Sequence, residues 1–208
     1  MICRRLEQQL ARYSNMEKLY DLWALRNPEW EIKYEDSIVK TYCDYGRGTT
    51  QLQDARGKIF GAGYEIYIIA FFIGLYFNKT KPLTKDTGKK KRFGQPIQYW
   101  GNQESRFGRV SYGRIREYIF AALIARTDVD FIALDKGEIT AKKVVDMLIE
   151  KMEDYANFGF AYMNEKMEDN PEYFYKESAF IRLFMGFTGT AVASGQNEEE
   201  PESLDWPD

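Results

Sequence analysis

The residues most able to do chemistry in this sequence form a basic run near its middle. Between Lys79 and Arg92 the chain carries seven lysines and arginines against one acid, Asp86. Ammonium and guanidinium groups at this density can neutralise the phosphates of a nucleic-acid backbone. Aromatic residues follow the run, and aromatic faces can stack on unpaired bases. The pattern predicts a surface that binds a polyanion.

The predicted nucleic-acid-binding residues combine this run with the basic and aromatic residues after it. They are Lys79, Lys81, Lys85, Lys89, Lys90, Lys91, Arg92, Tyr99, Trp100, Arg106, Arg109, Arg114 and Arg116. The basic side chains would contact phosphates, and Tyr99 and Trp100 would stack on bases. Such binding would be weak and would fall steeply with salt. In the alternative interpretation, the charges form a solvated loop that pairs with the acidic C-terminal half of the same chain.

The formal net charge of −3 conceals a strong asymmetry along the chain. Residues 1–46 carry a net charge of −1, residues 47–116 carry +10 and residues 117–208 carry −12. The last segment, 188–208, holds six acids and no Lys or Arg, and this composition is typical of a disordered tail. The tail could simply keep the protein in solution, or it could fold over the basic loop and compete with nucleic acid.

The sequence excludes several classes of mechanism. It contains no histidine, which removes Ser-His-Asp and Cys-His catalysis and HExxH zinc sites. Its two cysteines, Cys3 and Cys43, are too few for a Cys₄ metal site or a disulfide framework. Neither a Walker A motif nor a GxGxxG motif is present. The sequence therefore predicts no metal and no cofactor.

Cysteine usage and hydropathy bear on location. Two scattered cysteines suit the reducing environment of the cytoplasm, and the N-terminus lacks the apolar stretch of a signal peptide. The longest apolar run, 66–77, has twelve residues, whereas a membrane span needs about 20. We expect a cytoplasmic protein that does not contact the membrane.

Carboxylates offer a second kind of chemistry. Asp128 with Asp130, or Asp135 with Glu138, could hold a divalent metal or act as an acid and base on a sugar or phosphate substrate. Acidic loops are common, and nothing else in the sequence singles these pairs out. Glu65 is also of interest. It would favour the dipole of a helix that begins beside it, or it would be a catalytic or arginine-pairing carboxylate.

Periodicity and capping signals place the elements that must hold these residues. Ser14 and Glu17 form a capping box, Thr140 is an N-cap, and Asn170-Pro171-Glu172 would open the last helix. Residues 93–111 lack a clear period, and a short hairpin is possible there. The expected helices are 14–26, 34–44, 64–77, 112–126, 140–167 with a possible kink at Gly159, and one that starts at 170.

These elements predict an all-α fold. We expect a single-domain bundle of five or six helices, interrupted by a glycine-rich and basic irregular insertion. Segment 64–77 is apolar on every side except at Glu65, so it should be the buried helix. In this division, residues 1–13 are an N-terminal extension, 14–187 the helical domain and 188–208 the disordered acidic tail.

One segment resembles a known family. Residues 59–83 read IFGAGYEIYIIAFFIGLYFNKTKPL. An aromatic residue and an acid precede an apolar helix containing Ala and Gly, and a basic stretch ending in Pro-Leu follows. This arrangement is similar to a segment of small bacterial accessory proteins of DNA phosphorothioation and restriction systems. The resemblance implies a helical protein associated with DNA, and it transfers no catalytic residue.

Three functions are consistent with these observations. The first is a cytoplasmic nucleic-acid-associated or protein-interaction module of bacterial type whose basic loop, 79–116, binds a phosphate backbone. The second is a carboxylate-dependent hydrolase, and the third is a structural or interaction protein without ligand chemistry. The binding module accounts for the charge block, so it stands first. Whether the chain is also an enzyme is left open by its motifs.

Overall fold

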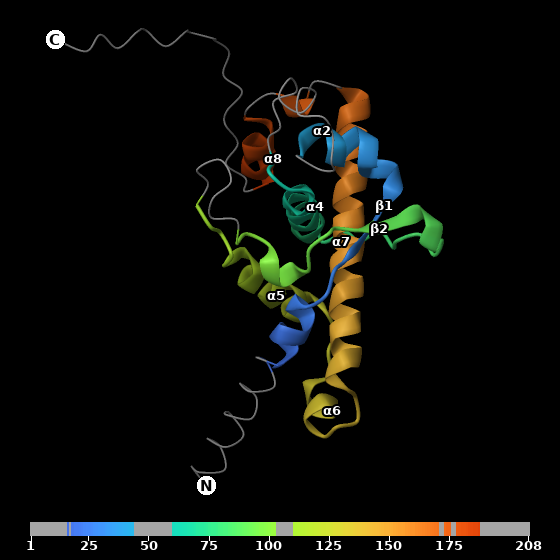
Figure 1. The fold of residues 1–208 in the computed structure, drawn as a ribbon, viewed down its shortest axis with the longest axis vertical. Helices are drawn as coiled ribbons and strands as arrows, with labels where there is room; N and C mark the ends of the chain where they lie inside the picture. Colours follow the sequence, from blue (N-terminus) through green and yellow to red (C-terminus); the bar gives the residue numbers. More distant parts are fainter. Residues whose placement is uncertain are drawn as a thin grey trace, which may run out of the picture.

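The computed structural model describes residues 16, 18–43, 60–102, 110–170, 173–175 and 178–187. Within these ranges the chain is mostly helical and includes one two-stranded sheet (Figure 1). The elements in chain order are a helical segment at 18–24, β1 (Glu29–Glu31), η1 (Ile32–Tyr34), η2 (Glu35–Val39), α2 (Lys40–Tyr42), α4 (Gly63–Phe77), η3 (Thr87–Lys89), β2 (Lys90–Arg92), η4 (Ile97–Tyr99), α5 (Ile115–Arg126), α6 (Phe131–Asp135), α7 (Ala141–Asp169), η5 (Tyr173–Tyr175) and α8 (Ala179–Phe187).

The central element is α4, as its apolar sequence predicted. Its residues from Gly63 to Gly74 are almost all buried, and α2, α5, α7 and α8 surround it in Figure 1. The view in that figure runs nearly along α4, whereas α7 stands upright in the plane. The two longest helices therefore cross steeply instead of lying side by side as in a simple bundle.

The crossing of α4 and α7 depends on two glycines. A Cβ atom placed on Gly74 would overlap the backbone carbonyl of Tyr155, and one placed on Gly159 would overlap the backbone carbonyl of Ala70. Each helix thus presents bare backbone to the other, which allows an approach closer than ordinary side chains permit. α7 runs through Gly159, where a kink was thought possible, as one uninterrupted helix. The glycine lies where the backbone of α7 meets that of α4.

Both long helices have clear end signals. The Thr140 hydroxyl accepts a hydrogen bond from the Lys143 N–H at 3.2 Å and caps α7, as the sequence predicted. Asn78 ends α4 in the left-handed region, with φ at 49°. Its side-chain oxygen also accepts a hydrogen bond from the Tyr155 hydroxyl at 3.1 Å. The end of α4 is therefore tied to the middle of α7.

Three helical boundaries differ from the predicted ones. The expected helix at 34–44 is a succession of short turns, η1, η2 and α2. The helix expected from Tyr112 begins at Ile115, because Tyr112 instead bonds the Gly101 carbonyl through its N–H at 2.9 Å. The last helix does not open at Asn170: this residue ends α7, and a 3₁₀ turn at 173–175 precedes α8.

The sheet corrects the all-α prediction. β1 and β2 pair antiparallel in the register Glu29 to Arg92, Trp30 to Lys91 and Glu31 to Lys90. The basic segment 90–92, expected to be a loop, is thus a strand. Its partner lies some sixty residues upstream, whereas the hairpin was expected at 93–111. The described residues of 93–111 contain a 3₁₀ turn, η4, and no strand.

Aromatic packing explains why β2 lies on β1. The rings of Phe93 and Trp30 stack with centroids 5.4 Å apart, and Tyr67 of α4 meets Phe93 edge-on at 5.7 Å. Phe160 of α7 covers Trp30 from the other side at 6.4 Å. Each contact of this type adds to the burial energy of large rings. Phe93, the residue immediately after β2, is therefore buried in the core and holds the end of the strand there.

Several expectations concern residues outside the described ranges. These are the extension at 1–13, Ser14 and Glu17 of the capping box, most of the glycine-rich segment, the middle of the possible hairpin and the acidic tail at 188–208. Among the described residues, none of the helices is long and apolar enough to cross a membrane.

The glycine contact gives a first prediction. Replacing Gly159 with Ala places a methyl group against the Ala70 carbonyl, so the free energy of unfolding should fall by about 3 kcal/mol or more. Gly94→Ala is the matched control, because no heavy atom lies within 4 Å of a Cβ built there. That variant should change stability by less than about 1 kcal/mol. Urea unfolding of both variants measures the difference, and equal stability would contradict the backbone contact.

Candidate functional site

The basic loop that the sequence singled out lies along the middle of α7. The N–H of Lys81 donates to the Asp154 carbonyl at 3.0 Å. One turn further, the side-chain amide of Asn157 donates to the carbonyls of Lys81 and Pro82, both at 3.1 Å. Asn157 is 1% exposed, so its amide is buried at the donor end of these partly buried bonds, which hold the loop backbone in place.

A buried carboxylate holds the loop from the other side. Glu31 of β1 accepts hydrogen bonds from the Thr84 N–H at 2.9 Å and from the Asn157 amide at 3.1 Å, and it pairs with the Lys33 ammonium. Burial alone would raise the pKa of Glu31, but the three donors outweigh it and keep the pKa below its ordinary value. The ionised group therefore links β1, the loop and α7.

The segment from Thr84 to Lys89 closes on itself. Asp86 accepts the Gly88 N–H at 2.9 Å through its carboxylate, and the Thr84 hydroxyl accepts the Asp86 N–H at 3.3 Å. The Lys89 ammonium lies 3.4 Å from the other oxygen of Asp86. Asp86 thus shapes the turn that contains η3.

Three of the predicted lysines project into solvent from this fixed backbone. Lys79, Lys81 and Lys85 are exposed, and no described acidic side chain lies within ion-pair distance of them. Lys79 lies over the ring of Phe158, 5.9 Å from its centroid. These ammonium groups are the part of the predicted surface that keeps its charge available.

The other basic residues of the run are engaged inside the molecule. Lys90 and Arg92 both bind Glu29, at 2.9 and 3.0 Å, and Lys91 binds Glu35 at 2.6 Å. Burial would raise the pKa of Glu29, but Lys90 and Arg92 lower it further than burial raises it. The Lys91 ammonium is the main cause of the lowered pKa of Glu35.

The acidic partners in these ion pairs differ from the predicted ones. In the alternative interpretation, the basic loop would pair with acids of the C-terminal half of the chain. In the structure, the partners of Lys90, Lys91 and Arg92 are Glu29 and Glu35. Opposite charges on facing strands stabilise an antiparallel pair. The sequence carries a signal for this pairing: Glu-Trp-Glu at 29–31 alternates in the manner of a strand, and its acids complement Lys-Lys-Arg at 90–92.

Tyr99 and Trp100, the two aromatic residues predicted to stack on bases, lie in different environments. Trp100 is fully buried and stacks on Tyr64 with centroids 5.4 Å apart. It leaves no face for a base, so the prediction that it stacks on nucleic acid is wrong. Tyr99 is 51% exposed and keeps a ring surface in solvent.

The predicted arginines also lie in different settings. Arg114 is exposed at the start of α5, and Arg116 donates to the carbonyl of Gln98. Arg106 and Arg109 lie outside the described residues. The basic surface defined by the described residues is therefore smaller than the sequence suggested.

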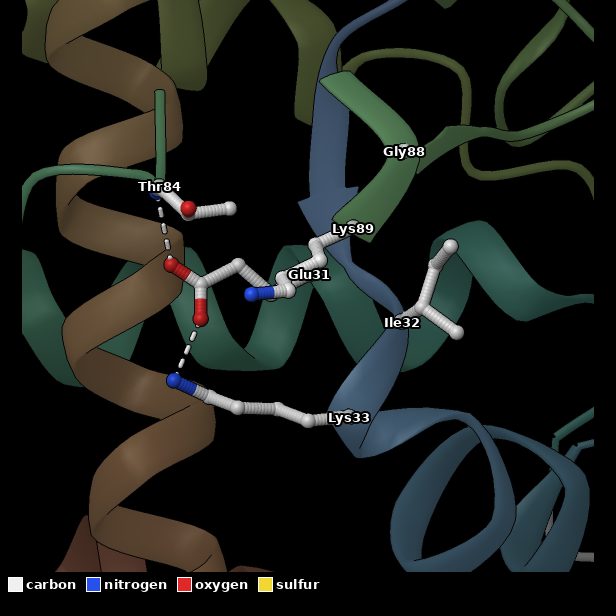
Figure 2. Close-up of a pocket in the computed structure, with 6 residues that line it drawn as sticks. All are labelled: Glu31, Ile32, Lys33, Thr84, Gly88 and Lys89. Carbon is white, nitrogen blue, oxygen red and sulfur yellow. Dashed lines mark hydrogen bonds and ion pairs between the residues drawn. The ribbon is translucent and has the colours of Figure 1, made fainter. Parts of the chain in front are cut away.

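A pocket opens at the head of the loop. It has a volume of about 420 Å³ and is lined by Glu31, Ile32, Lys33, Thr84, Gly88 and Lys89. Figure 2 shows the side chains of Lys33 and Lys89 entering from different segments of the chain, next to the Glu31 carboxylate. An adjoining hollow of about 270 Å³ shares Lys33 and also contains Lys81. The pocket and the hollow thus lie next to the exposed lysines of the basic loop.

One member of each carboxylate pair predicted for a hydrolase has a partner within the fold. Asp130 caps α6 by accepting the Ala133 N–H at 2.9 Å, and Glu138 lies 3.9 Å from the Lys136 ammonium. Glu65 accepts the N–H of Gly61 and the hydroxyl of Tyr112, so it organises the start of α4. Among the described residues, no group of three acids or cysteines could hold a metal ion.

Sequence reasoning missed a second cleft that lies beside α7. It has a volume of about 460 Å³, and its lining includes Arg26, Glu29, Asp146 and Glu153. Arg26 and Asp146 form an ion pair at 2.6 Å. Burial raises the pKa of Glu153 to about 7, although the Glu29 N–H donates to its carboxylate at 2.7 Å. No motif marks Glu153, because its environment arises from tertiary packing.

Comparison of the chain with protein-family models, with curated proteins and with solved structures gives no match. The similarity of residues 59–83 to accessory proteins of phosphorothioation systems therefore stays a prediction. The functional argument rests on the geometry of the loop and its pocket.

Glu153 predicts an unusual pH dependence of stability. Its ordinary pKa is 4.5 and its pKa in the fold is about 7, so the folded state retains a proton that the unfolded state has lost. Stability should therefore fall as pH rises from about 4.5 to 7. Glu153→Gln keeps the oxygen that accepts the Glu29 N–H and removes the titration. The variant should match the parent near pH 5 and exceed it at pH 8 by on the order of 1 kcal/mol.

Chemical denaturation at the two pH values measures this difference. Asp154, whose pKa burial also raises, is present in both proteins. A stability difference that does not grow between pH 5 and pH 8 would contradict the assignment to Glu153.

Proposed function

We propose that this protein is a polyanion-binding module that binds the phosphate backbone of nucleic acid through its basic loop. The contact residues are Lys79, Lys81 and Lys85, the lysines of the loop that no described acidic side chain pairs with. The single observation that supports the proposal is the contrast between a loop backbone held by hydrogen bonds to Glu31 and Asn157 and lysine side chains that extend from it into solvent. Such an arrangement holds three positive charges on a fixed backbone, and no described acid forms an ion pair with them.

The fixed backbone affects the energetics of binding. A mobile loop would lose backbone entropy on binding, at roughly 1–2 kcal/mol per ordered residue. Here Glu31 and Asn157 already order the loop, so binding costs mainly the rotamer freedom of the lysines. With about three phosphate contacts, the affinity should be modest and the logarithm of the binding constant should fall with log salt with a slope of about −2 to −3.

The alternative of a pure interaction protein has less support. Large apolar side chains are exposed on several different elements. They include Leu25, Tyr76, Tyr99, Tyr118, Ile132 and Ile181. Single exposed apolar residues are normal on a protein surface, whereas an unneutralised row of lysines on a rigid loop is a specific feature. The proposed function accounts for that feature.

Fluorescence anisotropy with labelled single- and double-stranded DNA and RNA tests the proposal. Salt should run from about 50 to 200 mM, a range over which several phosphate contacts change affinity strongly. The double variant Lys81→Gln/Lys85→Gln removes two proposed contacts. It should weaken binding to every sequence and reduce the salt slope by about two.

A matched control separates local contacts from net charge. Lys142 and Lys143 are exposed in the first turn of α7, about 18 Å from Asp154 at 1.5 Å per helical residue. Lys142→Gln/Lys143→Gln makes the same charge change and should leave affinity and slope near those of the parent. Salt-independent binding, no binding at 50 mM salt, or equal losses in both variants would overturn the proposed function.

A further inference from the structure

The pocket at the head of the basic loop has a chemistry of its own. Lys33 comes from η1 and Lys89 from η3, so the two ammonium groups reach the same 420 Å³ space from different sides (Figure 2). Thr84 lines the pocket as well. Its hydroxyl oxygen accepts the Asp86 N–H, which leaves the hydroxyl proton able to donate. Three donors therefore surround one cavity.

The acids near the pocket do not cancel these charges. The Glu31 carboxylate already accepts from Thr84 N–H and Asn157 in addition to Lys33. Glu31 is the one carboxylate among the lining residues, and Lys33 pairs with it. Lys89 lies 3.4 Å from Asp86, an exposed residue outside the lining, and such surface pairs contribute little. Counted over the lining alone, two lysines and one carboxylate give a formal net charge of +1, which favours an anion.

The adjoining hollow behaves differently. It also contains two lysines, Lys33 and Lys81, but Glu165 and Glu168 line it too. Its charges balance, so an anion gains little by entering it. The preference for an anion is therefore confined to the pocket between Lys33 and Lys89.

We propose that this pocket binds a phosphate monoester, namely the terminal phosphate of a nucleic-acid strand. The inference rests on the proposed function and names the part of the nucleic acid that the site selects. Lys33 and Lys89 would bind the phosphate oxygens, and the Thr84 hydroxyl would donate a third hydrogen bond. The rest of the strand would leave the pocket along Lys81 and Lys85.

The chemistry of the two kinds of phosphate supports this choice. A backbone phosphodiester carries one negative charge and has a sugar on each side, so it suits an open row of lysines. A terminal monoester carries a charge of about −1.5 to −2 at neutral pH and is substituted on one side only. It can therefore enter a recess. The volume of about 420 Å³ lies within the usual range of ligand pockets and leaves room for part of the terminal nucleoside.

A free mononucleotide presents the same monoester, so the experiment includes both sources. Three labelled single strands of one sequence would carry a 5′-phosphate, a 3′-phosphate or hydroxyls at both ends. Anisotropy at 50 mM salt gives their affinities, and calorimetry gives the affinity for adenosine monophosphate. We expect one phosphorylated strand to bind at least about tenfold more tightly than the hydroxyl strand. The mononucleotide should bind more weakly, because it lacks the contacts to Lys81 and Lys85.

Two variants assign the preference to the pocket. Lys89→Gln should remove most of the preference for the phosphorylated end and leave binding of the hydroxyl strand largely unchanged. Asp86→Asn keeps the oxygen that accepts the Gly88 N–H and removes the charge that competes for Lys89, so it should enlarge the preference. Lys142→Gln is the control of equal charge. Lys89 is exposed, so its replacement should leave the thermal midpoint near that of the parent.

The outcomes separate this inference from the proposed function. Salt-dependent binding that ignores end phosphates overturns the pocket assignment and leaves the backbone-binding function intact. Failure of every strand to bind, together with Lys89-dependent binding of adenosine monophosphate, overturns the nucleic-acid function and transfers the monoester site to small ligands. A preference that survives Lys89→Gln overturns the assignment to this pocket.

Discussion

The contact between the backbones of α4 and α7 is the constraint on which the rest of the structure depends. Gly74 and Gly159 remove the side chains that would separate the two helices. The same stretch of α7 then serves two purposes, because residues one turn apart share a face. Tyr155 and Gly159 face α4, whereas Glu153 and Asn157 bind β1 and the basic loop. The helix crossing thus sets where the loop can lie.

The basic residues of the run fall into two groups, those that form ion pairs within the fold and those whose side chains extend into solvent. Glu29 of β1 and Glu35 of η2 form ion pairs with Lys90, Lys91 and Arg92, and these pairs help to hold β2 against β1. The loop that precedes the strand is held through its backbone, by Glu31 and Asn157. Lys79, Lys81 and Lys85 keep their side chains exposed on this backbone. This division explains how a run of similar residues can contain both members paired within the fold and members exposed to solvent.

Much of the helical architecture could be predicted from the sequence, since its signals are local. The apolar segment of α4, the Thr140 cap and the periodicity of α7 each involve neighbouring residues. The sheet could not be predicted in the same way, because β1 and β2 are about sixty residues apart and each is only three residues long. The aromatic residues were misjudged for a related reason. Trp100 sits in an irregular segment, and only its packing on Tyr64 shows that it belongs to the core.

The sequence by itself determined where positive charge is concentrated, which helices bury their apolar faces, and which histidine- and cysteine-dependent mechanisms are excluded. These properties depend on composition and short-range order. Only the tertiary structure decided which lysines are available, that Lys33 joins Lys89 at one pocket, and that Glu153 titrates near pH 7. Each of these depends on the distance between groups from remote segments and on their removal from water. Neither quantity exists until the chain has folded.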